Sequence, residues 1–277
     1  MKKAITLMFL HSSMAVAIQA QNNHFQIGIG YQQTFMIDNQ ASPLKYVSAE
    51  KTISLGYVHT GNKGRFKAEI NGALGDFFPA GFKNRQLYDP GYNSDGTEKT
   101  DSFQIEGKLY NARVKVGYLK QIGNSSSVIG TEKQYINNYV GASLNNQLFY
   151  SENFVRAGWL NSSTINAEYE HIAIYQVKHS FNIKLSIPLF GRNTRLPYHN
   201  TISSPEGYSG IKTIFKQGSS FSWLGNFQNI QLDAGYQYAA GKHVALGIHY
   251  FGQWLHYNKE IPITLFQNNI GVTASLK

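Results

Sequence analysis

Acidic residues and histidines are the side chains of this 277-residue chain that could activate a water molecule. A carboxylate–histidine pair can do so when both groups lie within hydrogen-bond reach of the reacting atoms. No pair among the candidates has the spacing of a catalytic motif that we can assign. We therefore interpret them as solvated charges of strand ends and external loops. The candidates are Asp76, Asp101, Glu168, Glu170, His171 and His179.

Serine chemistry and metal binding have weaker support. Ser180 follows His179 directly, and neighbours on a strand point to opposite faces, so the two cannot form an oriented catalytic pair. His243 and His249 stand six residues apart, which is about 20 Å along a strand and too far to share one ion. The chain has no cysteine, so thiolate metal sites and disulfides are excluded. The sequence predicts no catalytic residue, no metal site and no cofactor.

The elements that must position these residues are predicted from an alternation of side chains. Even positions from Ile230 to Tyr238 are apolar or aromatic, whereas the odd positions between them are polar or small. The same alternation resumes from Val244 to Trp254. Successive strand side chains point to opposite faces, so each segment has one apolar and one polar face. Long strands with an apolar outer face, a polar inner face and aromatic ends are typical of transmembrane β-barrels.

The two segments are predicted to form a hairpin. Their apolar faces must coincide, so the loop between them must hold an odd number of residues. The three residues Ala239 to Gly241 satisfy this condition, with glycine at the position that favours a left-handed backbone. This register pairs Leu232 with Ile248. It also pairs Gln231 with His249.

Eight further segments bring the predicted strand count to about ten, an even number as bacterial outer-membrane barrels usually have. The segment 208–224 is the least regular of them. A parity change in the fourth strand predicts a β-bulge near Leu109. The predicted strands are 25–31, 53–57, 66–74, 103–119, 136–148, 181–189, 208–224 and 266–276, beside the two of the hairpin.

Connector lengths predict a topology. The long segments 79–100 and 151–178 are expected outside the cell, and the tight turns 60–64 and 239–241 on the periplasmic side. The segment 123–133 is interpreted as a connector. The segment 151–178 is open to two interpretations, a long loop or an additional pair of weak strands.

Composition and the N-terminus agree with an exported membrane protein. Charged residues make up 15% of the chain, against about 25% in ordinary soluble domains. Residues 1–20 resemble a secretory signal peptide, with Lys2 and Lys3 before an apolar run and a cleavage site after Ala20. The net charge of +9 is not gathered into a basic run or helix, so nucleic-acid binding is not expected. We expect a barrel domain over residues 21–277.

The signal peptide, the strand rhythm and the terminal strand, with Phe266, Ile270 and Val272 on one face, resemble small Gram-negative outer-membrane β-barrel proteins. The resemblance covers nearly the whole mature chain and is one of pattern, without a subfamily. It implies an all-β, antiparallel up-and-down transmembrane barrel of about ten strands (8–12). Short periplasmic turns, long external loops and a place in the cell outer membrane are also implied. Many members end in an aromatic residue, whereas this chain ends in Leu276 and Lys277.

The sequence therefore predicts a non-enzymatic outer-membrane barrel with a structural, adhesive or transport-accessory role. Its expected partners are outer-membrane lipid and, through the segments 79–100 and 151–178, other outer-membrane proteins or extracellular ligands. One alternative is an outer-membrane hydrolase, a protease or a lipid-modifying enzyme, with a site at the external rim. A second alternative is a soluble secreted barrel that binds a ligand, which would place its apolar face inside.

The lumen is expected to hold charged side chains of both signs. Buried charges are costly unless they are paired. We therefore predict a cross-linked polar cluster in place of a water-filled pore. Its predicted members are Lys67, Glu69, Arg113, Lys115, Lys184, Asp233 and His249.

Overall fold

The computed structural model describes residues 22–88, 91–98, 102–129, 132–152, 157–195, 209–259 and 261–276. The predicted signal peptide, residues 1–20, lies outside the described residues. Within the described residues, no helix is long and apolar enough to cross a membrane.

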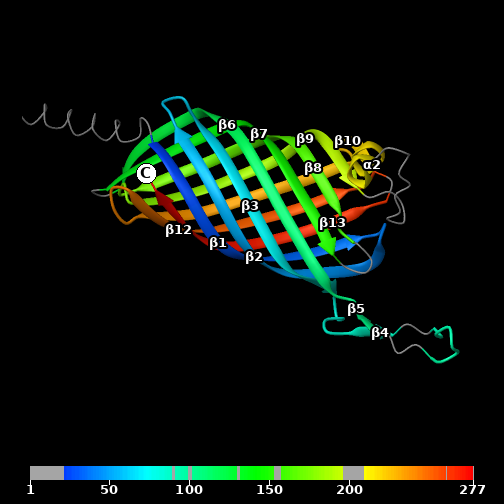
Figure 1. Cartoon of the computed structure of the whole chain (residues 1–277). Helices are drawn as coiled ribbons and strands as arrows, with labels where there is room; N and C mark the ends of the chain where they lie inside the picture. Colours follow the sequence, from blue (N-terminus) through cyan, green and yellow to red (C-terminus); the bar gives the residue numbers. More distant parts are fainter. Residues whose placement is uncertain are drawn as a thin grey trace, which may run out of the picture.

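Ten antiparallel strands close into a barrel (Figure 1). Each strand pairs with its neighbours in the chain, and the first strand pairs with the last. The predicted all-β, up-and-down barrel of about ten strands is thereby confirmed. The barrel strands are β1 (Asn22–Asp38), β2 (Ser42–Thr60), β3 (Gly64–Pro79), β6 (Gly107–Ile129), β7 (Glu132–Glu152), β8 (Leu160–Tyr175), β9 (His179–Arg195), β11 (Phe227–Ala239), β12 (Val244–Tyr257) and β13 (Ile263–Leu276).

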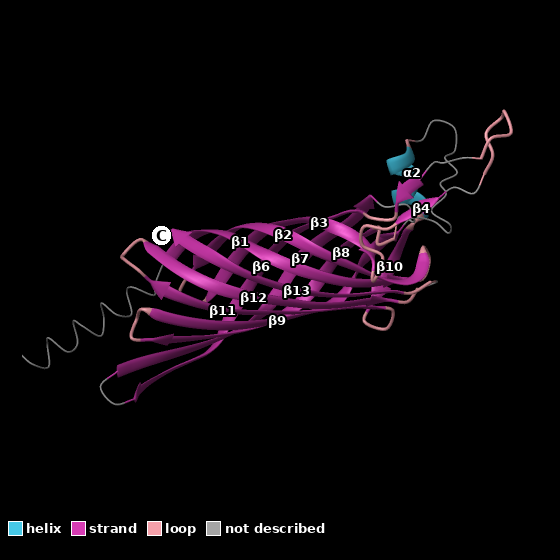
Figure 2. Cartoon of the chain, turned by 90° about the horizontal axis from the view of Figure 1, so that it is seen from below, coloured by secondary structure: helices cyan, strands magenta, loops and turns pink. Residues whose placement is uncertain are grey.

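The two ends of the barrel differ in their connections. At the end that holds Asn22 and Leu276, the connections are short: 61–63, 130–131, 176–178 and 240–243. At the opposite end the segments 80–106 and 196–226 carry additional elements (Figure 2). Short turns on one side and long loops on the other follow the outer-membrane habit. We call these ends periplasmic and external.

The external end carries a small two-stranded ribbon, β4 (Gln86–Tyr88) and β5 (Ser102–Gln104), which projects away from the barrel (Figure 1). It also carries α2 (Gly210–Gln217) and the short strand β10 (Ser219–Trp223). β10 pairs with the outer part of β9, directly above the part that pairs with β11. β10 and β11 therefore act as one broken strand of the barrel wall.

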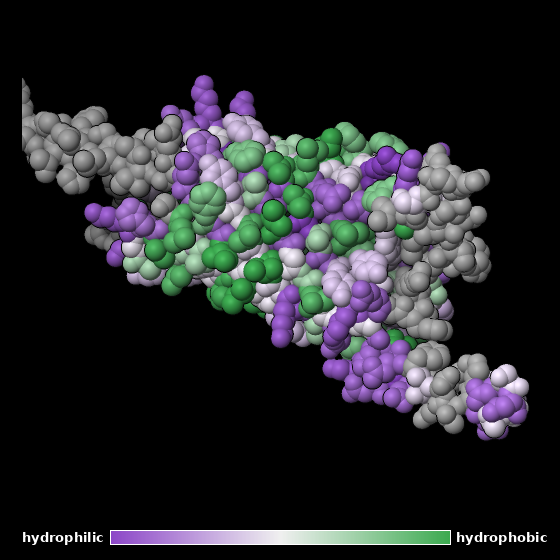
Figure 3. Space-filling view, in the orientation of Figure 1, coloured by the Kyte–Doolittle hydropathy of each residue, from purple (hydrophilic) through white to green (hydrophobic). Residues whose placement is uncertain are grey.

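Apolar side chains cover the outside of the barrel wall. Val272 on β13 is 53% exposed and its partner Ile248 on β12 is 59% exposed, because the outward face has no protein to cover it. Figure 3 shows apolar residues across the middle of the barrel and polar residues towards its ends. This agrees with the predicted faces of the hairpin and disagrees with the soluble alternative.

Adjacent residues of β13 test these faces. Val272 points outward, and Thr273, which has nearly the same shape, lines the interior cavity. A lysine on the lipid face near the bilayer centre costs about 2–4 kcal/mol in such barrels. We expect Val272→Lys to lower the folding stability by about that amount and Thr273→Lys to lower it much less. Urea unfolding in lipid vesicles measures both, and equal losses would show that the faces are assigned wrongly.

The register of the β11–β12 hairpin differs from the predicted one by four residues. Leu232 pairs with Gly252 and Gln231 with Gln253, because the strands continue to Ala239 and the turn lies further along the chain. The predicted loop Ala239 to Gly241 is therefore wrong. A shift by an even number keeps every side chain on its predicted face.

The β6–β7 hairpin also differs from the prediction. The segment 123–133, predicted as a connector, is mostly strand, since β6 runs to Ile129 and β7 starts at Glu132. The register shift in this pair lies between Gln121 and Gly123, and the predicted bulge near Leu109 is wrong. Leu109 continues the inward parity of β6 and is fully buried.

Two segments have other structures than predicted. β8 occupies most of 151–178, so this segment is neither the long loop nor the pair of weak strands that the sequence left open, but one full strand of the barrel wall. The segment 208–224 contains α2 and the short β10 in place of a full strand. The strand count of ten is right because β8 takes the place of the predicted strand 208–224.

Candidate functional site

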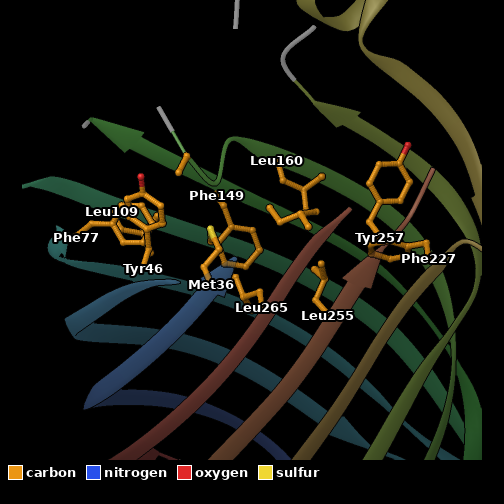
Figure 4. Packing of buried hydrophobic residues seen from close by; sticks show 12 residues of the cluster. Met36, Tyr46, Phe77, Leu109, Phe149, Leu160, Phe227, Leu255, Tyr257 and Leu265 are labelled. Atoms are coloured by element: carbon orange, nitrogen blue, oxygen red, sulfur yellow. The ribbon is translucent and has the colours of Figure 1, made fainter. Parts of the chain in front are cut away.

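The barrel interior is the candidate site, and its external end is closed by apolar side chains. All of these residues except Ala157 stand near the external ends of their strands, and the labelled side chains gather inside the barrel in Figure 4. Phe77, Leu109 and Phe149 are each 0% exposed. We call this group the external apolar cluster: Met36, Tyr46, Phe77, Leu109, Phe149, Ala157, Leu160, Phe227, Leu255, Tyr257, Ile263 and Leu265.

Sequence reasoning missed this cluster, although a signal for it is present. Leu109 has the parity of the polar inner face, and so does Phe77 on β3. For Leu109 this parity led to the predicted bulge, whereas Phe77 lies beyond the predicted strand 66–74. Apolar residues on the inner parity at the external ends of several strands indicate a hydrophobic closure.

An ion pair accompanies the cluster at the external end. Arg195 Nη2 lies 2.5 Å from Asp38 Oδ1, and both side chains are buried. The same guanidinium donates to the carbonyl oxygen of Ile261, and the other oxygen of Asp38 accepts from the backbone N–H of Gly158 at 2.8 Å. The pair thereby links strands β1 and β9 to the two external connections that contain Gly158 and Ile261. We call it the external ion pair.

Amide side chains fill the lumen beneath the apolar cluster. Gln253 Nε2 donates to Gln147 Oε1 at 2.8 Å and to Asn229 Oδ1 at 2.7 Å. Glu50 accepts hydrogen bonds from Gln32 at 2.6 Å and from Thr34 at 2.5 Å. These side chains are buried and bond to one another across the lumen, so they fill it at this level. We call these residues the amide layer.

Ion pairs form the next layer towards the periplasm, which we call the charged layer. Glu170 on β8 meets Arg65 at 2.9 Å and Lys67 at 2.5 Å, both from β3. Its side chain is 1% exposed. Two cations therefore share one buried carboxylate across the barrel.

The charged layer continues on the neighbouring strands. Lys115 Nζ lies 2.6 Å from Glu168 Oε1. Lys184 Nζ lies between two carboxylates, 3.4 Å from Glu69 and 3.5 Å from Asp233. Each pair joins residues from different strands, so the ion pairs hold the barrel walls together across the lumen.

The structure places the seven residues of the predicted lumen cluster on the inner face. Lys67, Glu69, Lys115, Lys184 and Asp233 take part in the ion pairs of the charged layer. The other two lie beside that layer. Arg113 stacks on the ring of Phe251. His249 lies opposite Gly235 and Gly271, whose lack of a side chain leaves room for the imidazole.

Sequence reasoning placed Glu168 and Glu170 at the external rim, and this was wrong. β8 carries both inward to the charged layer, because residues 160–175 form a strand. The remaining rim candidates do not gather either. Asp76 pairs with Lys108 at the exposed external end, whereas His179 stacks on Tyr236 near the periplasmic end.

His171 lies on the outer face of β8, where a nitrogen of its ring forms a hydrogen bond with Asn138 Oδ1 at 2.8 Å. Asp101 lies outside the described residues. No group of three or more histidine, aspartate or glutamate side chains that could hold a metal ion occurs in the described part of the chain.

A cavity of about 700 Å³ occupies the lumen on the periplasmic side of the amide layer. Its lining reaches from turn residues at the periplasmic end, such as Asn62 and Lys178, to Gln147 in the amide layer. The charged side chains Arg65, Lys67 and others of the charged layer line its wall. The cavity thus forms a vestibule at the end of the barrel that we call periplasmic, and it ends below the external apolar cluster.

The closed ten-stranded wall, its apolar outer face and its polar interior are the features that decide the class of fold. The chain has the fold of an outer-membrane β-barrel. No protein-family model matches the sequence, and no curated protein matches it.

Several solved structures of barrels are similar over most of the chain. The outer membrane protease OmpT from Escherichia coli has a TM-score of 0.46 at 9% identity, with 92% of this chain and 96% of that chain covered. The Pseudomonas putida toluene transporter TodX has a TM-score of 0.35 at 9% identity, with 92% and 90% covered. Neisserial surface protein A has a TM-score of 0.32 at 9% identity, with 91% and 96% covered.

Proposed function

We propose that this protein is a non-enzymatic outer-membrane β-barrel whose lumen is sealed and which holds its external segments at the cell surface. Its role would be structural, adhesive or accessory to transport. The observation that carries this proposal is the filling of the lumen near its external end by the external apolar cluster and the amide layer. A solute cannot pass a layer in which the side chains are 0–5% exposed unless that layer rearranges.

Barrel size supports a sealed lumen. The interior of a barrel of about eight strands is just filled by side chains, and aqueous channels occur in barrels of about 16–18 strands. With ten strands the barrel is near the lower limit. A ten-stranded barrel is wider than one of about eight strands, and the cavity on the periplasmic side is the space that this extra width leaves open.

The external segments are the surfaces available for partners. The β4–β5 ribbon projects beyond the barrel rim (Figure 1). β4 lies within the predicted external segment 79–100, and β5 follows that segment. At the same end of the barrel, α2 and β10 expose Phe215, Phe221 and Trp223. Aromatic side chains at this level are typical of membrane–water interfaces. We assign lipid contact to the apolar band, which is the apolar outer face of the barrel wall, and partner binding to the projecting β4–β5 ribbon.

A hydrolase with a rim site has less support. Its candidate acids and histidines lie in separate places: Asp76 at the external end, Glu168 and Glu170 in the lumen, and His179 near the periplasmic end. A carboxylate and a histidine that activate one water must lie within hydrogen-bond reach of it.

Cell fractionation tests the location. We expect the protein in the outer-membrane fraction, resistant to carbonate extraction, because the apolar band needs lipid around it. Folded protein should also migrate faster than boiled protein on a detergent gel. Recovery from the soluble periplasm would contradict the proposal. The sealed lumen is tested separately by the ionic current through the purified protein.

A further inference from the structure

Ion pairing in the charged layer leaves one cation without an acid. Each of the four carboxylates of the layer forms an ion pair with a lysine, and one of them also pairs with an arginine. The Arg113 guanidinium makes no ion pair and no hydrogen bond with the described residues, and its Nε is buried without a partner. The basic side chains of the layer are Arg65, Lys67, Arg113, Lys115 and Lys184, and the acidic ones are Glu69, Glu168, Glu170 and Asp233.

The surroundings of Arg113 hold it at the cavity wall. The residue is 9% exposed and lines the cavity. Its guanidinium carbon lies 4.0 Å from the centre of the Phe251 ring. Stacking on a ring uses the face of the guanidinium and leaves the N–H groups at its edge unused. Its cross-strand neighbours, Asn71 and Gln147, carry no charge.

Glu50 does not serve as the missing acid. Ser54 on β2 stands at the register level of Asn71 and Arg113, and Glu50 lies four residues from it towards the external end. The oxygens of Glu50 already accept hydrogen bonds from Gln32 and Thr34 in the amide layer. A buried cation without a counter-ion is costly. An anion that enters the cavity would remove that cost.

We propose that the periplasmic vestibule binds a small molecule with a single carboxylate, and that Arg113 is its bidentate partner. A carboxylate matches the planar fork of a guanidinium with two parallel hydrogen bonds. A single negative charge is favoured because one cation is in excess. The cavity of about 700 Å³ falls within the size range of small-molecule sites. Asn71 and His249 line the cavity beside Arg113 and add polar contacts. The inference does not depend on whether the lumen is sealed.

Calorimetric titration of the detergent-solubilised, folded protein with benzoate tests this site. We expect saturable binding of one benzoate per barrel and no binding of benzamide, its neutral counterpart of similar shape. Arg113→Gln should weaken benzoate binding about tenfold or more, because charge-assisted hydrogen bonds are lost. Lys108→Gln is the matched control: it removes one positive charge at the external rim and should leave the affinity unchanged.

A second variant keeps the test decisive if Arg113→Gln does not fold. Asn71→Asp places a carboxylate on the residue opposite Arg113 in the register and gives the guanidinium a partner from the chain itself. Benzoate binding should then weaken by a similar factor although Arg113 is present. The proposal is overturned if benzoate does not bind the wild-type protein saturably. It is also overturned if the folded variants bind benzoate as tightly as the wild type.

Discussion

Replacing Glu170 by glutamine is expected to destabilise the barrel by about 3–5 kcal/mol, since removal of one partner leaves the other charges of a buried ion pair uncompensated. Glu170 is fully buried and contacts both Arg65 and Lys67. Glutamine keeps the shape of the side chain and removes only the charge. The two cations would then face each other in the lumen without an acid. Equilibrium unfolding in urea, followed by tryptophan fluorescence in lipid vesicles, measures the loss.

Asp76→Asn is the matched control for this substitution. This substitution also removes one carboxylate of an ion pair, but the side chains of Asp76 and Lys108 are 51% and 53% exposed. Exposed pairs contribute about 0–1 kcal/mol. A double variant, Glu170→Gln with Lys67→Met, should recover part of the stability because it removes one unpaired cation. Equal losses for Glu170→Gln and Asp76→Asn would show that the lumen pair is solvated and not buried.

Phe149→Ala is expected to cost about 3–5 kcal/mol, the range for truncating a buried phenylalanine. Phe149 is 0% exposed in the external apolar cluster (Figure 4). The loss combines the transfer of the ring with the cavity that it leaves. Phe221→Ala on β10 should cost much less, because Phe221 is 64% exposed. The unfolding midpoints of the two variants in vesicles make the comparison, and similar shifts would mean that the cluster is not a packed core.

The effect of Phe149→Ala on permeability should be small. Gln147, Gln253 and Asn229 close the lumen beneath the cluster through their own hydrogen bonds. Losing one ring above them leaves this layer in place. A large current through the Phe149→Ala protein would show that the apolar cluster alone closes the barrel.

Side-chain parity was enough to predict the faces of the regular strands, such as β9, β11, β12 and β13. Val272 and Ile248 face outward and Lys184 and Asp233 face inward because strand geometry enforces alternation. The register was not predictable in the same way. The β11–β12 turn lies beyond Ala239 to Gly241, and a shift of four residues leaves every face unchanged, so no hydrophobic pattern distinguishes the two registers.

β8 was harder to predict from the sequence because its inner face is apolar at both ends. Leu160 and Ile172 point inward, and Ser163 points outward, which obscures the alternation on which strand prediction depends. The same effect hid the external apolar cluster. The ion-pair partners of the charged layer depend on contacts across the lumen, as between Glu170 and Lys67, and sequence spacing does not specify such contacts.

Planar-bilayer recording of the purified wild-type protein tests the sealed lumen most directly. The barrel should insert and give either no current or only rare, small openings. Insertion would be verified independently, by protection of the barrel from protease in the same lipid. A stable, large open-state current from verified single insertions would contradict the account, because the external apolar cluster and the amide layer would then not fill the lumen.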